Sequence, residues 1–375
     1  MGEYKFSGWF GVIFLGGMLS VASAQQVRPI EIGDAAPNFK LPGVDGKTHS
    51  LADYQDAKLL LVVFTCNHCP TAQAYEERIK QLDKDYGPRG VRLVAISPNS
   101  DAAVRPDELG WTDLNDSLDD MKARAEAAGF TFPYLYDGET QTVSRAFGAK
   151  ATPHVFLFDE NRMLRYSGRI DNSDVETPTS HDARDAIEAL LAGKEIKETE
   201  TRVFGCSVKW ADKIESAKVS IAKMDAQPVT LETIDSEGIK KLVANQTDNY
   251  RLINLWATWC GPCVVELPEF EQIGRWYSTR SFEVITISLD RPSQKEGVLD
   301  KLKELNVSLT NYLSTVTDVD EFGEALDSAW EGPVPYTLLV APGGKIVHRV
   351  EGEIDPLELR RAIVRHIGRT YASKR

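Results

Sequence analysis

The stretch LINLWATWCGPC, residues 252–263, decides the fold. Its first half is a continuous apolar run, as found in strands buried on both faces of a sheet. Cys260 and Cys263 follow this run, and a helical pattern begins at once after them. A cysteine at the start of a helix faces unpaired N–H groups and the positive end of the helix dipole, which stabilise its thiolate. Because the thiolate is the species that attacks disulfides, this arrangement predicts thiol–disulfide exchange.

A similar arrangement occurs earlier in the chain. The apolar run LLLVVFT, residues 59–65, leads into Cys66 and Cys69, and a helical pattern again follows. Each half then continues in the same order of strands and helices, which predicts two α/β three-layer sandwiches in tandem. The corresponding segments are 91–97 and 282–288 for a second strand, 118–128 and 294–305 for a helix, and 182–191 and 356–366 for a closing amphipathic helix.

Length and charge set broad limits. The chain has 375 residues, of which 42% are hydrophobic and 26% charged, and two domains are expected for this length. We expect them at residues 27–212 and 228–375, joined by a charged linker over residues 213–227. The net charge of -13 argues against nucleic acid or an anionic membrane as a partner.

The first 24 residues have the pattern of an export signal. Residues 9–21 form an apolar run too short to span a bilayer, and Ala22-Ser23-Ala24 supplies a small-residue cleavage pattern. We therefore expect a periplasmic or other extracytoplasmic protein with no stable membrane span once the signal is removed. An uncleaved amino-terminal anchor is the alternative. Export would place the five cysteines in an oxidising compartment.

Residues 228–375 resemble the exported TlpA-like thiol-disulfide oxidoreductases of the thioredoxin fold. The motif Trp259-Cys260-Gly261-Pro262-Cys263 is the active-site signature of that fold, and Glu266-Leu267-Pro268 follows it. The resemblance implies a cis peptide bond before Pro335 and a proton relay by Glu266. It also implies that Trp259 borders the substrate groove and that the Gly261-Pro262 spacer favours a reducing site. Simple packing for Trp259 and a solvated acid for Glu266 are the alternatives.

Residues 27–212 resemble the peroxiredoxin-like branch of the same superfamily, so both halves are expected to be thioredoxin-like sandwiches. This resemblance rests on segments 33–39, 65–70, 152–153 and 205–210, and it implies a cis peptide bond before Pro153. The peroxidase motif Pro-x-x-x-Thr-x-x-Cys is incomplete, because Val62 and Cys66 stand where its proline and threonine belong. Cys69-Pro70-Thr71 matches only its end.

The cysteine pairs are expected to share one mechanism. We expect Cys66 and Cys260 to attack, and Cys69 and Cys263 to resolve the mixed disulfide. His68 places an imidazole beside the first pair, as in the oxidising DsbA family, so this site is expected to be the more oxidising one. We expect no metal and no cofactor beyond the redox-active disulfides. The expected partners are thiol- or disulfide-containing envelope proteins and a redox donor or acceptor protein.

Two residues near the first pair leave their roles open. Cys206 is either a third redox thiol that captures a disulfide from the first pair or a small buried hydrophobic residue. His154, next to Pro153, either influences the site electrostatically or is structural.

Two other functions are compatible with these motifs. A thiol peroxidase that uses the N-terminal site and a non-catalytic binding module with structural disulfides are the alternatives. Two-residue spacers close very small loops, so such disulfides add little to the stability of a fold. Zinc binding by all four paired cysteines is disfavoured by their wide separation, and haem attachment by Pro70 and Val264, which follow the two pairs where histidine would be needed.

Overall fold

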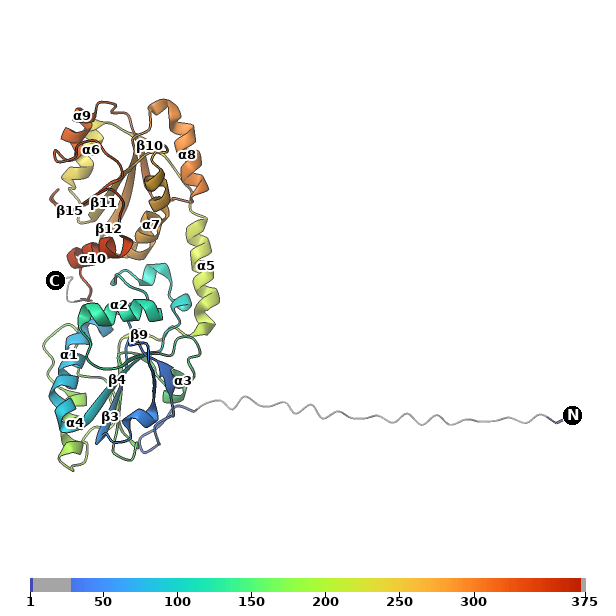
Figure 1. The fold of residues 1–375 in the computed structure, drawn as a ribbon, viewed down its shortest axis with the longest axis vertical. Coiled ribbons are helices and arrows are strands. Elements are labelled where there is room, and N and C mark those ends of the chain that lie inside the picture. Colours follow the sequence, from blue (N-terminus) through green and yellow to red (C-terminus); the bar gives the residue numbers. More distant parts are fainter. Residues whose placement is uncertain (3–27, 372–375) are drawn as a thin grey trace.

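The structure is a computed structural model that describes residues 1–2 and 28–371. The expected export signal therefore lies, from residue 3 onward, outside the described residues. The described chain forms two α/β domains stacked along the long axis of the molecule (Figure 1). This confirms the predicted tandem of thioredoxin-like sandwiches. Among the described residues, no helix combines the length and the apolar composition needed to cross a membrane.

The first domain is built on β3, the central strand of a sheet with the order β5–β4–β3–β7–β8. β4 and β5 run parallel to β3, whereas β7 runs antiparallel to it and forms a hairpin with β8. All six residues of β3 are buried, because alternate side chains enter cores on opposite faces of the sheet. The strands are β1 (Lys40–Pro42), β2 (Thr48–Ser50), β3 (Leu59–Phe64), β4 (Val91–Ser97), β5 (Tyr134–Tyr136), β7 (His154–Phe158) and β8 (Leu164–Gly168).

Helices cover both faces of this sheet. On one face Tyr75, Met121 and Ile187 share a core with the odd-numbered residues of β3. On the other face Phe147 packs against the even-numbered residues. These side chains come from α1 (Pro70–Tyr86), α2 (Leu118–Ala128), α4 (Asp182–Leu191) and α3 (Thr142–Phe147), respectively.

A separate two-stranded ladder lies beside the cysteines of the first domain. β9 (Cys206–Ser207) runs antiparallel to β6 (Ala151–Thr152), and Cys206 stands opposite Thr152. Gly205 has a φ of 137°, and a Cβ atom there would lie 2.0 Å from the Thr152 carbonyl oxygen. Glycine is therefore required at this close approach of two backbone segments.

The second domain repeats this plan with one more strand. Its sheet has the order β10–β13–β12–β11–β14–β15, with β12, β13 and β10 parallel to β11 and a β14–β15 hairpin on the other side. The strands are β10 (Glu232–Ile234), β11 (Tyr250–Trp256), β12 (Phe282–Ser288), β13 (Thr310–Ser314), β14 (Tyr336–Val340) and β15 (Ile346–Glu351). The helices are α6 (Ser236–Ala244), α7 (Gly261–Tyr277), α8 (Lys295–Glu304), α9 (Val319–Leu326) and α10 (Pro356–Ile367). Ile253 packs toward α6 and α9, whereas Leu252 packs toward α7 and α10.

The linker is a helix rather than an irregular segment. α5 (Ile214–Asp225) occupies most of the predicted linker and lies along one side of the molecule between the domains (Figure 1). Only Ala217 is buried in it, which explains why the sequence shows no sustained apolar face there. Its helical structure was not predicted.

A direct contact also joins the domains. Tyr277, at the C-terminal end of α7, donates a hydrogen bond to the Thr112 carbonyl oxygen (2.9 Å). Beyond α10, Arg369 donates to Asp113 Oδ1 (2.6 Å) and to Gln73 Oε1 (3.3 Å). The C-terminal end of the described chain therefore lies against the first domain, close to the first turns of α1 (Figure 1).

Candidate functional site

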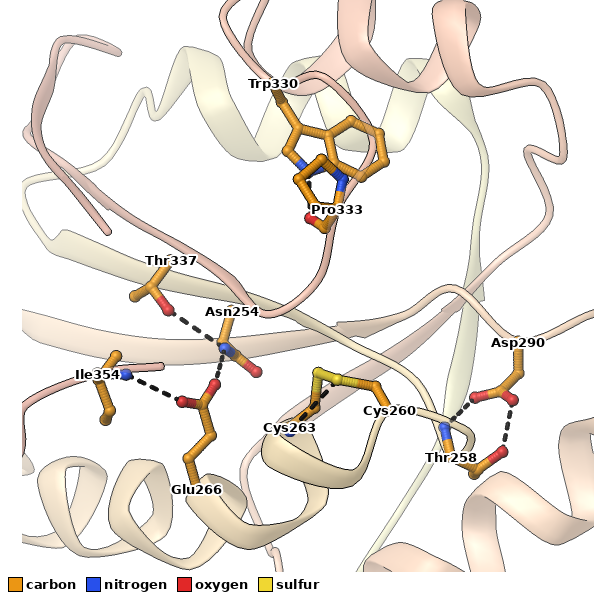
Figure 2. The surroundings of a disulfide bond; sticks show 10 residues. All are labelled: Asn254, Thr258, Cys260, Cys263, Glu266, Asp290, Trp330, Pro333, Thr337 and Ile354. Carbon is orange, nitrogen blue, oxygen red and sulfur yellow. Dashed lines mark hydrogen bonds between the residues drawn. A yellow bond between two sulfur atoms is a disulfide. The ribbon is translucent and has the colours of Figure 1, made fainter. Parts of the chain in front are cut away.

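The second cysteine pair forms a disulfide at the N-terminus of α7 (Figure 2). The Cα atoms of Cys260 and Cys263 are 5.3 Å apart, within the usual range for a disulfide. Cys260 is the N-cap residue, and its sulfur accepts a hydrogen bond from the Cys263 N–H (3.3 Å). Cys263 is fully buried, whereas Cys260 retains 6% of its surface. Cys260 is therefore the more exposed cysteine of the pair.

The turn before the disulfide is held from outside the motif. Asp290, which follows β12, accepts hydrogen bonds from Thr258 N–H (2.9 Å) and Thr258 Oγ1 (2.6 Å). These bonds fix the turn that presents Trp259, whose side chain is 66% exposed. The packing alternative for Trp259 is therefore wrong. A groove runs beside it, lined among others by Arg291, Val316 and Trp330.

A buried carboxyl group lies behind the disulfide. Glu266 rises from α7 toward the sheet (Figure 2), where it accepts hydrogen bonds from Asn254 Nδ2 (3.2 Å) and Ile354 N–H (3.2 Å). Burial raises the pKa of Glu266 from 4.5 to about 7, because it penalises the carboxylate more than these two donors stabilise it. A solvated surface acid is therefore excluded. Glu266 can take up or release a proton near neutral pH beside the buried Cys263.

Both predicted cis prolines are confirmed. The Thr152–Pro153 and Val334–Pro335 peptide bonds are cis. Each precedes the strand that pairs with the central strand of its sheet, β7 with β3 and β14 with β11. Thr152 lies directly beside the first cysteine pair, because Cys66 Sγ is 3.1 Å from its Oγ1 and Cys69 Sγ is 3.3 Å from its carbonyl oxygen.

The predicted geometry of the first pair needs correction. α1 begins at Pro70, so Cys69, and not Cys66, is the N-cap residue whose sulfur accepts a hydrogen bond from Ala72 N–H (3.4 Å). Both cysteines are buried free thiols. Burial, followed by the neighbouring Cys69 thiolate, raises the pKa of Cys66 well above its ordinary value. The helix end therefore falls on Cys69, and the expectation that the first cysteine lies there is wrong for this domain.

The acidity of Cys69 has several sources. Burial opposes its ionisation, but hydrogen bonds from the Cys206 and Cys66 thiols, the charge of His68 and the Ala72 N–H outweigh this effect. The pKa of Cys69 is therefore lowered well below that of an ordinary thiol. These contributions agree with the position of the sulfur at a helix N-terminus.

His68 owes its charge to a residue that the sequence did not point to. Its Nδ1 lies 2.5 Å from Asp116 Oδ2, and both residues are buried. Burial disfavours the imidazolium, but the Asp116 carboxylate raises the pKa of His68 above its usual value. Asp116 reaches the site from the loop before α2, 48 positions away, and no local motif marks it. Sequence reasoning missed it for that reason.

The carboxylate of Asp116 also organises the loop that carries the cysteines. It accepts hydrogen bonds from Asn67 N–H (2.8 Å), His68 N–H (3.1 Å) and Asn99 Nδ2 (2.7 Å). Cys66, His68 and Asp116 offer metal-ligand atoms within 4.8 Å of one another. Since Asp116 is already engaged by four donors, an ion pair that orients His68 explains this cluster.

His154 lies apart from this network. It accepts from or donates to Ser167 Oγ (3.1 Å) and accepts from Lys150 N–H (3.3 Å). Burial, followed by the charge of Lys150, lowers the pKa of His154 to about 3, so it is neutral at physiological pH. His154 is therefore structural and adds no charge to the cysteine site.

One family model matches this chain in both domains. The model described as the AhpC/TSA family matches residues 32–167 and again residues 222–349. Together these two matches cover well over half of the sequence.

Relatives with a known activity match part of the chain. ResA of Oceanobacillus iheyensis, a thiol-disulfide oxidoreductase, is 28% identical over 133 residues, which are 35% of this chain and 58% of that protein. ResA of Geobacillus thermodenitrificans is 26% identical over 163 residues, 43% of this chain and 79% of that protein. This chain thus spans less than two thirds of the first of these relatives.

Solved structures resemble single halves of the chain. A hypothetical protein from Sinorhizobium meliloti 1021 is 35% identical and covers 49% of this chain and 97% of its own, with a TM-score of 0.44. A putative thiol:disulfide interchange protein DsbE from Chlorobium tepidum is 20% identical and covers 44% of this chain and 97% of its own, with a TM-score of 0.33.

Proposed function

Because this chain belongs to the AhpC/TSA family and carries its domain twice, we propose that it is a thiol-disulfide oxidoreductase with two active sites. The observation that carries this proposal is the Cys260–Cys263 disulfide at a helix N-terminus, with Glu266 buried behind it. The ResA relatives, which are named for the same activity, support it.

In the second site, reaction begins at Cys260. A partner thiolate attacks the Cys260 sulfur, the bond to Cys263 breaks, and a mixed disulfide forms. The departing Cys263 sulfur is buried, so it must gain a proton, which Glu266 can supply because its pKa is about 7. A second partner thiol then attacks the mixed disulfide and leaves both cysteines reduced. The reverse sequence reduces a partner disulfide.

In the first site, Cys69 is the cysteine that reacts with the partner, as Cys260 does in the second. Its thiolate attacks a partner disulfide, and Cys66 is the nearby thiol that resolves the mixed disulfide. Stabilising the thiolate stabilises the reduced form of the pair, which makes its disulfide more oxidising. We therefore propose that the disulfide of the first site is more oxidising than that of the second.

The proposed partners are envelope proteins that carry thiols or disulfides, together with a protein that supplies or removes electrons. The export pattern over residues 1–24 supports this location. The exposed Trp259 and its groove offer an apolar border along which an extended polypeptide can lie. The redox chemistry uses the cysteines themselves and needs no further cofactor.

Insulin reduction by the full chain with dithiothreitol tests the proposal. We expect the chain to accelerate insulin precipitation, and Cys260→Ser to remove most of this acceleration. Val265→Ser, an exposed change on the same helix, is the matched control and should retain the activity. An unaltered rate in Cys260→Ser, or no acceleration by the parent chain, would contradict the proposal.

A thiol peroxidase remains the second candidate for the first domain. The observation that favours it is the acidic Cys69 at the N-terminus of α1 in a member of the AhpC/TSA family. Peroxide consumption that is lost in Cys69→Ser and kept in Cys260→Ser would establish this activity. Equal consumption by Cys69→Ser and the parent chain would rule it out.

A further inference from the structure

Three thiols, and not two, meet in the first domain. Cys66, Cys69 and Cys206 form one contact cluster with Ala72. Cys69 is the common member, because Cys66 and Cys206 both pack beside it and both lower the pKa of its thiol. The backbone N–H of Cys206 also donates to Cys69 Sγ (3.4 Å). Cys69 therefore has two neighbouring thiols with which it can form a disulfide.

The β6–β9 ladder holds Cys206 beside the first cysteine pair. Cys206 pairs with Thr152 in the β6–β9 ladder, and Thr152 itself contacts the sulfurs of Cys66 and Cys69. Gly205 allows the two backbones to approach, since any side chain would collide with the Thr152 carbonyl. Directly after β9, Lys209 is tied to Glu108 by an ion pair (2.6 Å). Cys206 is thus held beside the cysteine pair by its pairing with Thr152 and by the ion pair that fixes the chain just after β9.

The three thiols differ in accessibility. Cys69 is fully buried and Cys66 is 3% exposed, whereas Cys206 is only partly buried. A partner that cannot reach the buried pair can therefore still reach Cys206. The alternative role of Cys206 as a small buried hydrophobic residue explains neither its partial exposure nor its position against Cys69.

We propose that Cys206 is a third exchange thiol that moves the disulfide of the first domain from Cys66–Cys69 to Cys69–Cys206. This deepens the proposed function, on which it rests. The Cys206 sulfur attacks Cys69, the Cys69–Cys206 bond forms, the Cys66–Cys69 bond breaks, and Cys66 leaves with the electron pair and takes up the proton that Cys206 gives up. No external oxidant is needed, because one disulfide replaces another.

The second half of the cycle involves a partner dithiol. One partner thiolate attacks the sulfur of the partly buried Cys206 and releases Cys69 as a thiolate, which its surroundings stabilise. The second partner thiol attacks the mixed disulfide, so that the partner is oxidised and all three cysteines are reduced. Two electrons pass from the partner to the site, and in this direction of transfer the partner reacts at Cys206 rather than at the buried Cys69.

The charge on Cys69 controls when Cys206 can act. The Cys69 thiolate is the leading cause that raises the pKa of Cys206, and burial is the next. When Cys69 is part of a disulfide its negative charge is absent, while Lys209 still favours the Cys206 thiolate. Cys206 thus becomes a better nucleophile in the oxidised state, where its attack is required.

The test uses the full chain with Cys260→Ser/Cys263→Ser, so that only the thiols of the first domain can react. In this background Cys66→Ser is equilibrated with a glutathione redox buffer, free thiols are alkylated, and disulfides are identified by peptide mass mapping. We expect a Cys69–Cys206 disulfide in this variant. With Cys66 present we expect both disulfides, and with Cys206→Ser only Cys66–Cys69.

A matched control moves the thiol by one residue. In Cys206→Ser/Ser207→Cys the new thiol lies on the opposite face of β9, because successive strand residues point to opposite sides. With Cys66→Ser added, this control should form no bond to Cys69. Circular dichroism of each variant checks that the fold is retained.

The outcomes separate the two proposals. If Cys66–Cys69 forms with Cys66 present but Cys69–Cys206 never forms in Cys66→Ser at any glutathione ratio, the third thiol is refuted and the exchange function stands. If neither disulfide forms in any variant, exchange by the first domain is itself refuted. The proposal would also be overturned if the thiol introduced by Ser207→Cys in the control bonds to Cys69 as often as Cys206 does. That result would show that the position of the thiol on β9 does not matter.

Discussion

At the scale of residues, each site depends on a buried group that sets a proton equilibrium beside sulfur. In the second domain this group is Glu266, and in the first it is His68, whose pKa the Asp116 carboxylate raises. The paired cysteines could be found from the sequence because each pair forms a short motif, and Glu266 because it lies just after the second pair. Asp116 could not be found, because only the folded chain brings its loop to the cysteines.

Glu266→Gln should change how stability depends on pH. The folded-state pKa of about 7 lies above the ordinary 4.5, so the protonated group stabilises the fold fully below pH 4.5 and this contribution is lost as the pH rises through 7. Glutamine keeps the neutral shape and does not ionise. Between pH 4.5 and 8 we therefore expect the parent to lose about 2–3 kcal/mol of unfolding free energy relative to Glu266→Gln.

Urea denaturation of the oxidised proteins at several pH values measures this difference. Glu269→Gln, one turn along the same helix and partly exposed, is the matched control and should follow the parent. Parallel pH profiles for the parent and Glu266→Gln would contradict the buried-acid account.

At the scale of elements, the segments with a strong apolar pattern were predicted correctly. The strands at 91–97 and 282–288 and the helix at 118–128 match the structure residue for residue. The strands β10 and β13 on one side of the second sheet were missed, since each is short and mostly polar, and pairing with a neighbouring strand decides its structure. The start of α1 was misplaced for a related reason. Two residues between cysteines do not show which of the two begins the helix, and Pro70 decides it.

Gly205→Ala should damage the β6–β9 ladder. The new Cβ atom would lie 2.0 Å from the Thr152 carbonyl oxygen, so one backbone segment must move. We expect a loss of about 2–4 kcal/mol in unfolding free energy, measured by urea denaturation. Gly193→Ala is the control, because Gly193 also has a positive φ of 65° but open space around its Cβ position, and it should cost only about 1 kcal/mol. Equal losses in the two variants would show that the close approach is unimportant.

At the scale of the whole molecule, the two sites face different surroundings. α7 has 17 residues, so Cys260 at its start lies about 26 Å from Tyr277, which touches the first domain at the other end. The first site lies close to the domain boundary, where Arg369 contacts Gln73 in the first turns of α1. In this arrangement Cys260 lies far from the domain boundary, so we expect the two sites to react separately.

The two sites should therefore behave independently. Replacing the second pair by Cys260→Ser/Cys263→Ser should leave the midpoint potential and the oxidation rate of the first site unchanged, as measured in glutathione buffers by peptide mass mapping. A change of tenfold or more in that rate, equivalent to about 1.4 kcal/mol, would show that the domains move far enough to pass disulfides between them.

The end of α1 and its surroundings make the Cys69 thiol acidic, and we expect the N-terminus of α7 to do the same for Cys260 once its disulfide is reduced. The most direct measurement is the pH titration of thiolate absorbance at 240 nm on the fully reduced full chain, with Cys69→Ser and Cys260→Ser used to assign each transition. We predict that removing either cysteine abolishes a transition well below the ordinary thiol pKa of about 8.5, and that His68→Gln raises the transition of Cys69. Titration of both cysteines at or above that ordinary value would contradict the account.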